Sequence, residues 1–512
     1  MRTTPRRRVG LAAAVAALVA LSLSGCFGTA KAPVSNTSTP TGEATSAELA
    51  PFYTQKLVWT DCEDDMQCTT AKAPLDYRDP AAADVELALI RHPATGQKIG
   101  SLLVNPGGPG GSGYDFVRDS LDYAVDKKLQ EHFDVVGFDP RGVNKSTPVA
   151  CYQPAQMDQY LYSIAPGDIG SDPWIAAQQA SAQSFAQACN ANTGVLLDNI
   201  DTVSAARDMD LLRAVLGDKK LSYLGYSYGT ALGANYAGLF PEKVGRMVLD
   251  GALDPTSDNF EVTKEQAKGF ESALRAYLTD CLGDSKTCPF TGSVDDSMGT
   301  VRALLDSVQA QPIRATDGRE LGSSALLTAI IYPLYSQEGW PALSQMFDSV
   351  MAGEADTAFY FADEYNGRNK DGSYRDNSTE AFLGVNCMDY SYNADPATMR
   401  AQADELEKAA PTIGLYMSYG DITCANWPYT TRADREPIHA KGSPPIVVVG
   451  TTNDPATPYV WAKALADQLD KGVLVTYHGE GHTAYNKSNS CVNDAVDTYL
   501  LTGKAPSSDP KC

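Results

Sequence analysis

The chain has 512 residues, of which 43% are hydrophobic and 20% are charged, and its formal net charge is -22. This composition is typical of a globular protein, and the length allows two or three domains or one large domain with an insertion. The acidic balance excludes nucleic acid as a partner, because phosphate binding requires a basic face. The acidity itself favours solubility rather than any particular substrate.

The N-terminus has the pattern of a bacterial lipoprotein signal peptide. Four arginines among the first eight residues precede an apolar stretch at 10–23, which is too short to span a bilayer. The sequence Leu23-Ser24-Gly25-Cys26 then resembles a lipobox, so residues 1–25 are predicted to be removed and Cys26 to carry the lipid. Ordinary secretory cleavage, with Cys26 incidental, is the alternative. Residues 26–50 are rich in Thr, Ser, Ala and Pro and predict a flexible tether.

Beyond the tether, strand-like and helix-like segments alternate. Strands are expected at 85–90, 101–104, 133–138, 221–224 and 244–249, and helices at 203–215 and 230–236. Continuous apolar strands between helices indicate a parallel sheet that is covered on both faces.

The alternation stops after Asp254-Pro255. Residues 256–410 have helical character, with segments near 262–283, 297–309, 323–333 and 338–351, and strand character returns at 445–449 and 472–477. The sequence therefore predicts an α/β domain formed by residues 51–254 and 411–512, with a helical insertion at 255–410.

Residues 225–229, Gly-Tyr-Ser-Tyr-Gly, have the G-x-S-x-G form of a nucleophile elbow. The predicted strand before them and the predicted helix after them supply the context that gives this motif its meaning, because the tight turn lifts the Ser227 hydroxyl clear of the sheet. A glycine-rich loop is the alternative, since such pentapeptides also arise by chance.

A serine nucleophile needs a base and a group that orients the base. In the α/β-hydrolase fold these follow in the order Ser, acid, His. Asp454 and His482 lie on loops after the two last strands, in that order, and are the predicted acid and base. Asp250 is the alternative acid and His478 the alternative base. The remaining histidines, His92, His132 and His439, are predicted to be surface or structural residues.

The oxyanion of a tetrahedral intermediate needs backbone donors. The N–H of Tyr228, directly after the nucleophile, is one predicted donor, and Gly108 in the glycine-rich loop at 105–113 is the other. A phosphate cradle is the alternative for this loop, but it lacks the Gly-Lys-Ser/Thr ending of a P-loop and the G-x-G-x-x-G spacing.

Cysteine use supports export. Apart from Cys26 there are ten cysteines, and an even number is typical of a disulfide framework in an oxidising compartment. Pairing of neighbours along the chain is the favoured scheme among the connectivities that ten cysteines allow: Cys62 with Cys68, Cys151 with Cys189, Cys281 with Cys288, Cys387 with Cys424, and Cys491 with Cys512. The zinc patterns of paired C-x-x-C or clustered His do not occur, so neither a metal nor an organic cofactor is predicted.

Six segments together resemble the exported tripeptidyl-aminopeptidase group of actinobacteria, within the prolyl-aminopeptidase-like α/β-hydrolase serine peptidases, which also includes a mycobacterial cell-envelope serine hydrolase. The segments are 59–62, 105–110, 138–142, 225–229, 249–251 and 454–458, and the resemblance extends from about residue 55 to the C-terminus. It implies a helical lid, a Ser227–Asp454–His482 triad, and release of short peptides, tripeptides above all, from free N-termini. Prolyl aminopeptidases have a His where this chain has Pro106, so proline specificity is not expected to carry over.

These observations predict an exported serine exopeptidase without cofactors, a monomer anchored to the cell membrane only through the lipid on Cys26, with later shedding left open. Its expected partners are peptide or protein substrates. Asp389 is a candidate anchor for the substrate ammonium, with a surface or turn Asp as the alternative, and Thr457 is a candidate substrate-binding residue that could also support the acid loop. The alternatives for function are a serine carboxylesterase or lipase on the same fold and a non-catalytic binding lipoprotein.

Overall fold

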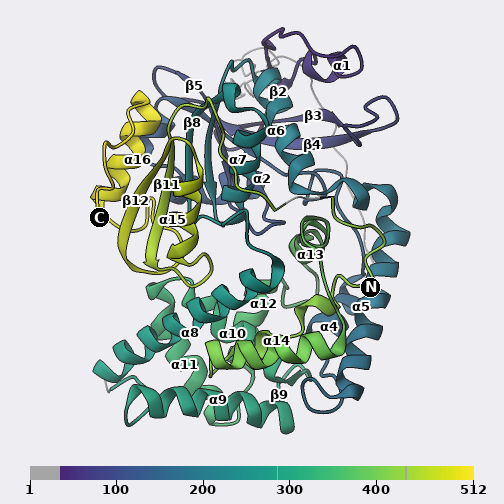
Figure 1. Cartoon of the computed structure of the whole chain (residues 1–512), viewed down its shortest axis with the longest axis vertical. Helices are drawn as coiled ribbons and strands as arrows, with labels where there is room; N and C mark the ends of the chain where they lie inside the picture. The colour runs from purple at the N-terminus through teal and green to yellow at the C-terminus, as the bar shows by residue number, and fades with distance from the viewer. Residues whose placement is uncertain (1–34, 285, 433–434) are drawn as a thin grey trace, which may run out of the picture. The chain divides into compact units, whose positions relative to one another are not determined.

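The computed structural model describes residues 35–284, 286–432 and 435–512, and a ten-stranded sheet runs through this part of the chain (Figure 1). The strand order is β1-β2-β3-β4-β6-β5-β7-β8-β11-β12. The six strands from β6 to β12 are parallel to one another, and β1 to β4 pair antiparallel at one edge. The predicted, mainly parallel sheet is confirmed. The strands are β1 (Ser35–Thr37), β2 (Val58–Glu63), β3 (Met66–Pro74), β4 (Asp84–His92), β5 (Gly100–Asn105), β6 (Phe133–Phe138), β7 (Leu221–Tyr226), β8 (Val244–Asp250), β11 (Ile446–Asn453) and β12 (Gly472–Glu480).

Helices cover both faces of the sheet, as the continuous apolar strands require. Strand β11 shows the alternation that produces this: Val447 and Val449 belong to the apolar cluster on one face, and Ile446 and Val448 to the cluster on the other. The first face is covered by α2 (Gly113–Ala124), α3 (Lys127–Gln130) and α16 (Ser490–Thr502), and the second by α6 (Thr202–Leu216), α7 (Tyr228–Leu239) and α15 (Tyr459–Gln468).

The segment between β8 and β11 is helical and has an apolar core of its own. The four helices predicted there occur within a few residues of their expected positions. In Figure 1 most insertion helices lie together on one side of the sheet, with α13 between them and the sheet. The insertion contains α8 (Asn259–Gly283), α9 (Val294–Ala310), α10 (Ser323–Leu334), α11 (Trp340–Met351), α12 (Asp356–Asn366), α13 (Ser378–Asp389) and α14 (Pro396–Ala409), with the short pair β9 (Ile313–Arg314) and β10 (Glu320–Leu321).

Two segments that the sequence places in the α/β domain pack partly with the insertion. Helices α4 (Pro154–Tyr162) and α5 (Asp172–Thr193) extend from the α/β part, and Tyr162 lies in the apolar core of the insertion. Ile175 of α5 packs in one cluster with Met399 of α14. Past the expected boundary at 411, Ile413 is also buried in the insertion core. The boundaries predicted at 254 and 411 therefore differ from the packing, because these residues bury their apolar faces against insertion helices.

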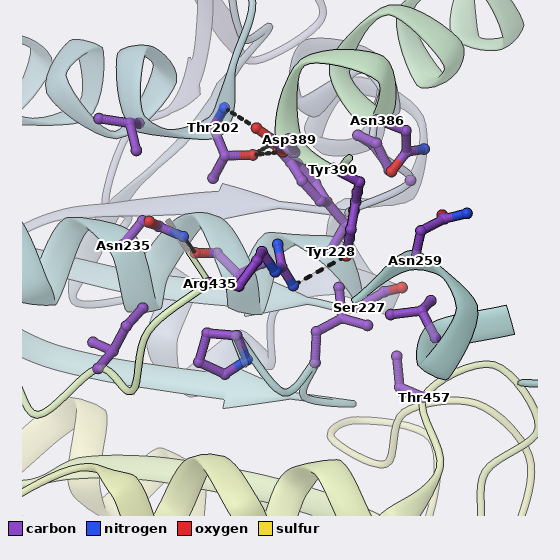
Figure 2. A pocket seen from close by; sticks show the side chains of 18 of the residues that line it. Thr202, Ser227, Tyr228, Asn235, Asn259, Asn386, Asp389, Tyr390, Arg435 and Thr457 are labelled. Atoms are coloured by element: carbon purple, nitrogen blue, oxygen red, sulfur yellow. Dashed lines mark hydrogen bonds between the residues drawn. The ribbon is translucent and has the colours of Figure 1, made fainter. Parts of the chain in front are cut away.

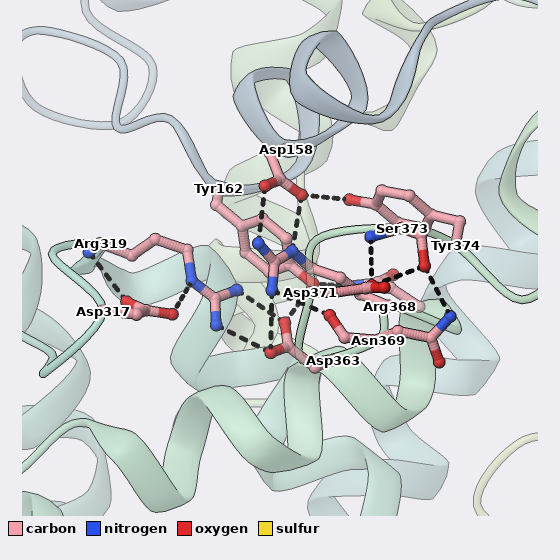
Figure 3. Close-up of polar contacts among 11 residues, drawn as sticks. Asp158, Tyr162, Asp317, Arg319, Asp363, Arg368, Asn369, Asp371, Ser373 and Tyr374 are labelled. Atoms are coloured by element: carbon pink, nitrogen blue, oxygen red, sulfur yellow. Dashed lines mark hydrogen bonds and ion pairs between the residues drawn. The ribbon is translucent and has the colours of Figure 1, made fainter.

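Charged residues fasten the insertion to α4 (Figure 3). The Arg368 guanidinium donates to both carboxylate oxygens of Asp158 on α4, at 2.7 and 2.8 Å. Asp158 also accepts from the Tyr374 hydroxyl at 2.8 Å. Within the insertion, Arg319 donates to both oxygens of Asp363 at 2.6 and 2.7 Å.

The expected tether is shorter than predicted, because residues 35–49 belong to the fold. Strand β1 pairs with β2, and Glu43 forms ion pairs with Arg213 at 2.8 Å and with Lys243 at 3.0 Å. A one-turn helix, α1 (Ala50–Tyr53), follows. The predicted signal peptide, the lipobox residue Cys26 and the start of the tether lie outside the described residues. In the part of the chain that is described, no helix is both long enough and apolar enough to cross a membrane.

All five disulfides expected from neighbour pairing are formed: Cys62–Cys68, Cys151–Cys189, Cys281–Cys288, Cys387–Cys424 and Cys491–Cys512.

Candidate active site

Ser227 stands at the sharp turn between β7 and α7. Its backbone has φ 54° and ψ -126°, a conformation that non-glycine residues rarely adopt and that is characteristic of a nucleophile elbow. Hydrogen bonds hold the turn on both sides: the Ser227 N–H donates to the carbonyl of Asp250 at 2.9 Å, and the Thr230 N–H donates to the carbonyl of Ser227 at 2.8 Å. A Cβ at Gly225 would lie 2.4 Å from the carbonyl oxygen of Gly229, so this position requires glycine.

The glycine-rich loop after β5 lies directly against this elbow. A Cβ at Gly107 would come within 2.9 Å of both the Ser227 Cβ and the backbone nitrogen of Tyr228. The Gly107 N–H is used by the Asn105 side chain, to which it donates at 3.0 Å. Gly108, with φ 111°, lines a cavity together with Ser227 and Tyr228. The structure thus brings together the nucleophile and both residues predicted as oxyanion donors.

Asp454 and His482, on the loops after β11 and β12, form a close pair. His482 Nδ1 lies 2.9 Å from Asp454 Oδ1 and 3.0 Å from Oδ2. The carboxylate is buried and accepts three backbone N–H groups, from Ala456, Thr457 and Thr483, at 2.8 to 3.1 Å. A buried carboxylate with this many donors has a fixed orientation, which in turn fixes the imidazole.

The insertion also positions the histidine. The backbone N–H of His482 donates to the backbone carbonyl of Tyr335 at 2.8 Å. The imidazole of His482 and the phenol ring of Tyr335 meet edge to face, with centroids 5.4 Å apart. Tyr335 directly follows α10. The hydrogen bonds within the described residues do not include one between Ser227 and His482, so the pair that is already joined in this structure is the acid and the base.

The structure separates the alternatives that the sequence left open. Asp250 is buried and accepts the N–H groups of Ala484 and Tyr485 at 2.8 to 3.0 Å, which anchors the loop after His482 rather than the imidazole. Burial raises the pKa of Asp250. His478 is exposed on β12.

Thr457 is hydrogen-bonded within the acid loop. Its hydroxyl donates to Asp454 Oδ2 at 3.0 Å and lies 3.3 Å from His482 Nδ1. Thr457 also lines the cavity that contains Ser227, so it belongs both to the acid loop and to the cavity wall.

Figure 2 shows the cavity, which has a volume of about 640 Å³. This volume falls within the range of ~300–1,000 Å³ that is usual for ligand sites. Other parts of the wall come from the insertion and from the segment before β11, and include Asn259, Asn386, Arg435 and Glu436. Across the described residues, no cluster of three or more His, Cys, Asp or Glu is placed to hold a metal ion.

Asp389, the last residue of α13, lies in the cavity wall, but its carboxylate is already occupied. Oδ1 accepts the Thr202 N–H at 2.9 Å, and Oδ2 accepts the Thr202 hydroxyl. The Thr202 hydroxyl in turn bonds the Tyr228 hydroxyl. Burial raises the pKa of Asp389 to about 7. Asp389, the residue expected to meet a substrate ammonium, is therefore connected by hydrogen bonds through Thr202 to Tyr228 of the elbow.

The residues of the site that escaped prediction include Thr202, Tyr335, Arg435 and Glu436. Tyr335 and Thr202 act through contacts with residues more than a hundred positions away or in another element, which local patterns do not reveal. Arg435 donates to the Ser257 carbonyl at 3.0 Å and to the Tyr390 hydroxyl at 3.3 Å. Its segment has no periodic pattern that would mark it as a cavity wall.

The parallel sheet, the strained serine at a strand-to-helix turn, and the acid and histidine on late loops define the chain as a serine hydrolase with the α/β-hydrolase fold. Comparison with known proteins agrees. The family model described as TAP-like protein matches residues 410–512, the part that carries Asp454 and His482.

Relatives match along most of the chain. Serine protease Hip1 of Mycobacterium tuberculosis is 36% identical, with 98% of this chain and 96% of the relative covered. Carboxylesterase B of the same species is 37% identical, covering 90% and 91%. Tripeptidyl aminopeptidase of Streptomyces lividans is 31% identical, covering 89% and 86%. The chain belongs to this TAP-like family of α/β-hydrolase serine peptidases.

Proposed function

We propose that the protein is an exported exopeptidase that releases short peptides, tripeptides above all, from free N-termini through an acyl-enzyme. The observation that carries the proposal is the His482–Asp454 pair beside a strained serine that faces a cavity walled by the insertion. Family membership and the name of the Streptomyces relative support the peptide substrate and the mode of cleavage.

In the proposed mechanism, the Ser227 hydroxyl attacks the carbonyl carbon of the scissile amide. His482 takes the hydroxyl proton through Nε2 and later gives it to the leaving amine. Asp454 keeps Nδ1 protonated and stabilises the imidazolium while the tetrahedral intermediate exists. Water then attacks the acyl-enzyme with His482 as the base. The carboxylic acid product departs, and the hydroxyl of Ser227 is regenerated.

The oxyanion would be bound by the N–H groups of Tyr228 and Gly108. Tyr228 is the first residue of α7, so its N–H is one of the amides that the helix leaves unpaired. In the glycine loop, the Gly107 N–H is already used by Asn105, and of the two loop residues that line the cavity, Gly108 and Pro109, Gly108 is the one with an N–H. Removal of one such donor costs ~10²–10³ in rate in comparable enzymes.

Cleavage at free N-termini needs an anion that meets the substrate ammonium. Among the described residues, two carboxylates line the cavity, Asp389 and Glu436. Asp389 is bound to Thr202, whereas Glu436 is exposed. We therefore assign the ammonium to Glu436 in place of Asp389. Glu436→Gln should raise KM for peptides with free N-termini roughly tenfold and leave the KM of a short acyl ester without an ammonium group unchanged; an equal effect on both would contradict the assignment.

The experiment that tests the function is product analysis by mass spectrometry after incubation with a peptide library in free and N-acetylated forms. The proposal expects di- to tetrapeptides, with tripeptides dominant, from free peptides only. Internal cleavage of acetylated peptides would make the protein an endopeptidase, and absence of any amide cleavage by a folded, probe-reactive enzyme would refute peptidase function.

One relative is named a carboxylesterase, which makes ester hydrolysis the second candidate activity of the same site. Acyl esters and amides of one acyl group distinguish the two. A peptidase hydrolyses both, whereas an esterase hydrolyses only the ester, because the poorer amine leaving group requires protonation by His482 at the right position.

Export and anchoring rest on the N-terminal pattern and on the disulfides, which persist in oxidising compartments. We propose a cell-surface lipoprotein bound to the membrane through Cys26. Replacement of Cys26 by Ser should release active enzyme from the membrane fraction. Membrane retention of this variant would contradict the lipid anchor.

A further inference from the structure

We propose that helix α13 of the insertion braces the oxyanion hole, with Asp389 as a positioning residue that acts on Tyr228 through Thr202. The inference rests on the proposed function in one respect, the role of the Tyr228 N–H as an oxyanion donor. It assigns to Asp389 a role other than contact with substrate, and to α13 a role other than that of a movable cover.

The C-terminal end of α13 is bound to the elbow through three buried side chains (Figure 2). Asp389 accepts both the N–H and the hydroxyl of Thr202, the first residue of α6. The Thr202 hydroxyl then bonds the phenol of Tyr228, the first residue of α7. Burial raises the pKa of Tyr228, so this phenol stays protonated and can donate. This series of hydrogen bonds therefore ends on Tyr228, the residue whose backbone N–H faces the expected oxyanion.

The other half of α13 lies against the glycine loop that supplies the second donor. A Cβ at Gly110 would lie 2.6 Å from the carbonyl oxygen of Ser378 and 2.9 Å from the backbone nitrogen of Phe382. The first turn of α13 and the loop of Gly108 are therefore in backbone contact. One helix thus contacts both structures from which the oxyanion donors come.

Several contacts keep α13 in place. The Cys387–Cys424 disulfide joins its last turn to the segment before β11. Glu380 is buried and accepts the N–H groups of Cys151 and Tyr152 at 2.9 and 3.1 Å. Asn377, just before the helix, donates to the carbonyls of Gly142 and Val149 at 2.9 and 2.8 Å. A helix held at both ends in this way is suited to fix a neighbour's position.

Substitutions that differ in hydrogen-bonding capacity distinguish a positioning role of Asp389 from a role in ammonium binding. An asparagine at 389 keeps both links to Thr202, because its carbonyl oxygen can accept the Thr202 N–H and its amide can donate to the Thr202 hydroxyl. It has no charge with which to hold an ammonium. Thr202→Val has the opposite effect: it keeps the carboxylate and the shape of residue 202 but breaks the link to Tyr228.

The experiment compares Asp389→Asn, Asp389→Ala, Thr202→Val, Thr202→Ser and Tyr228→Phe on a peptide anilide and on an acyl ester. Positioning predicts that Asp389→Ala, Thr202→Val and Tyr228→Phe lower kcat roughly 10- to 100-fold on both substrates with little change in KM, since the oxyanion forms only in the transition state. Asp389→Asn and Thr202→Ser should stay within about threefold of wild type. Affinity for a peptide boronic acid, which mimics the tetrahedral intermediate, should fall in parallel with kcat.

Asp421→Ala is the matched control. It removes another buried carboxylate near the cavity that accepts one backbone N–H, from Asn393, and one side-chain N–H, from Asn259. The kcat of this variant should change less than twofold. A larger decrease would show that loss of any buried carboxylate near the cavity lowers kcat.

A similar loss in Asp389→Asn and Asp389→Ala, confined to substrates with free N-termini and accompanied by normal Thr202→Val activity, would overturn the proposal in favour of ammonium binding. Unchanged kcat in all variants would also overturn it. If the proposed peptidase function is wrong, the wild-type protein will not hydrolyse the anilide. The effect of the variants on ester hydrolysis would still test the positioning role of Asp389.

Discussion

The parallel sheet and the helical insertion contribute to the site in different ways. The sheet carries the groups that react, each at the carboxyl end of a strand: Ser227 after β7, Asp454 after β11 and His482 after β12. The insertion contributes groups that hold these in position, through Tyr335 on His482 and Asp389 on Thr202. Chemistry thus depends on strand ends, whose geometry the fold fixes, while orientation depends on tertiary contacts from another part of the chain.

The two regions also differ in how they use charge. In the α/β part, Arg141 and Asp208 form a fully buried pair, with bonds of 2.6 and 2.7 Å. In the insertion, Arg319 and Asp363 form an equally short pair whose side chains are 16% and 15% exposed. The comparison teaches that the same chemical pair is a structural requirement in one region and a modest stabiliser in the other, because the cost of an unpaired charge depends on access to water.

The largest change in stability is expected from Arg141→Met. It leaves Asp208 buried without its counter-ion, with the Tyr77 hydroxyl still donating to it at 2.8 Å, and removes the donors to the carbonyls of Pro74, Leu75 and Asn199. Loss of one partner of a buried pair costs about 3–5 kcal/mol. Denaturant unfolding should show this decrease in the free energy of unfolding. A decrease below about 1 kcal/mol would contradict the difference in ion-pair energetics between the two regions.

Removal of the Cys387–Cys424 disulfide by paired Ser substitution should have the next largest effect. A loop of this length contributes about 2–4 kcal/mol, and the loss should fall on α13. We expect faster hydrogen exchange in residues 378–389, measured by mass spectrometry, together with a lower kcat. The Cys281–Cys288 pair, replaced in the same way, is the control and should leave kcat unchanged. Equal effects of the two pairs on kcat would contradict the special position of α13.

Arg319→Met should cost less than Arg141→Met, about 1–2 kcal/mol, because water can reach the Asp363 that it leaves behind. The same unfolding measurement tests it. Lys264→Met, which removes an exposed pair with Glu405, is the reference at the low end and should change the free energy of unfolding by less than about 0.5 kcal/mol. If Arg319→Met cost as much as Arg141→Met, burial would not be the factor that separates the two regions.

The smallest effect, taken per pH unit, is a pH dependence of stability at Asp389. Burial raises the pKa of Asp389 in the folded state to about 7, above its ordinary value of 3.8. Between these values the folded state binds more protons than the unfolded state, so the free energy of unfolding falls as pH rises, by at most ~1.4 kcal/mol per pH unit. Asp389→Asn removes this dependence. Melting curves from pH 4.5 to 7.5 should show the stability difference between variant and wild type shifting steadily toward the variant, and parallel curves would contradict the raised pKa.

Much of the sheet could be predicted from the sequence, because its strands are continuous apolar runs that end in glycine or aspartate. The elbow, Asp454 and His482 were accessible for the same reason: each follows such a run, and their order is that of the fold. The four long helices of the insertion could be located from their apolar spacing. The disulfides followed from the neighbour pairing of ten cysteines.

The antiparallel edge, α13 and the role of Asp389 could not be predicted. Strands β2 and β3 contain charged and polar residues on their exposed face, which hides their period. Helix α13 is only weakly amphipathic, because most of its residues are buried or partly buried, and the sequence offers only the charge of Asp389 as a clue to its role. Its true surroundings, Thr202 and Tyr228, come from segments 187 and 161 positions away, and only tertiary structure brings them together.

The most direct test of the central claim is covalent labelling with a fluorophosphonate probe followed by peptide mapping. The account predicts one labelled residue, Ser227, with no labelling in Ser227→Ala and labelling at least ~10³-fold slower in His482→Ala. Labelling of another serine, or absence of labelling in a wild-type protein whose circular dichroism shows it to be folded, would contradict it.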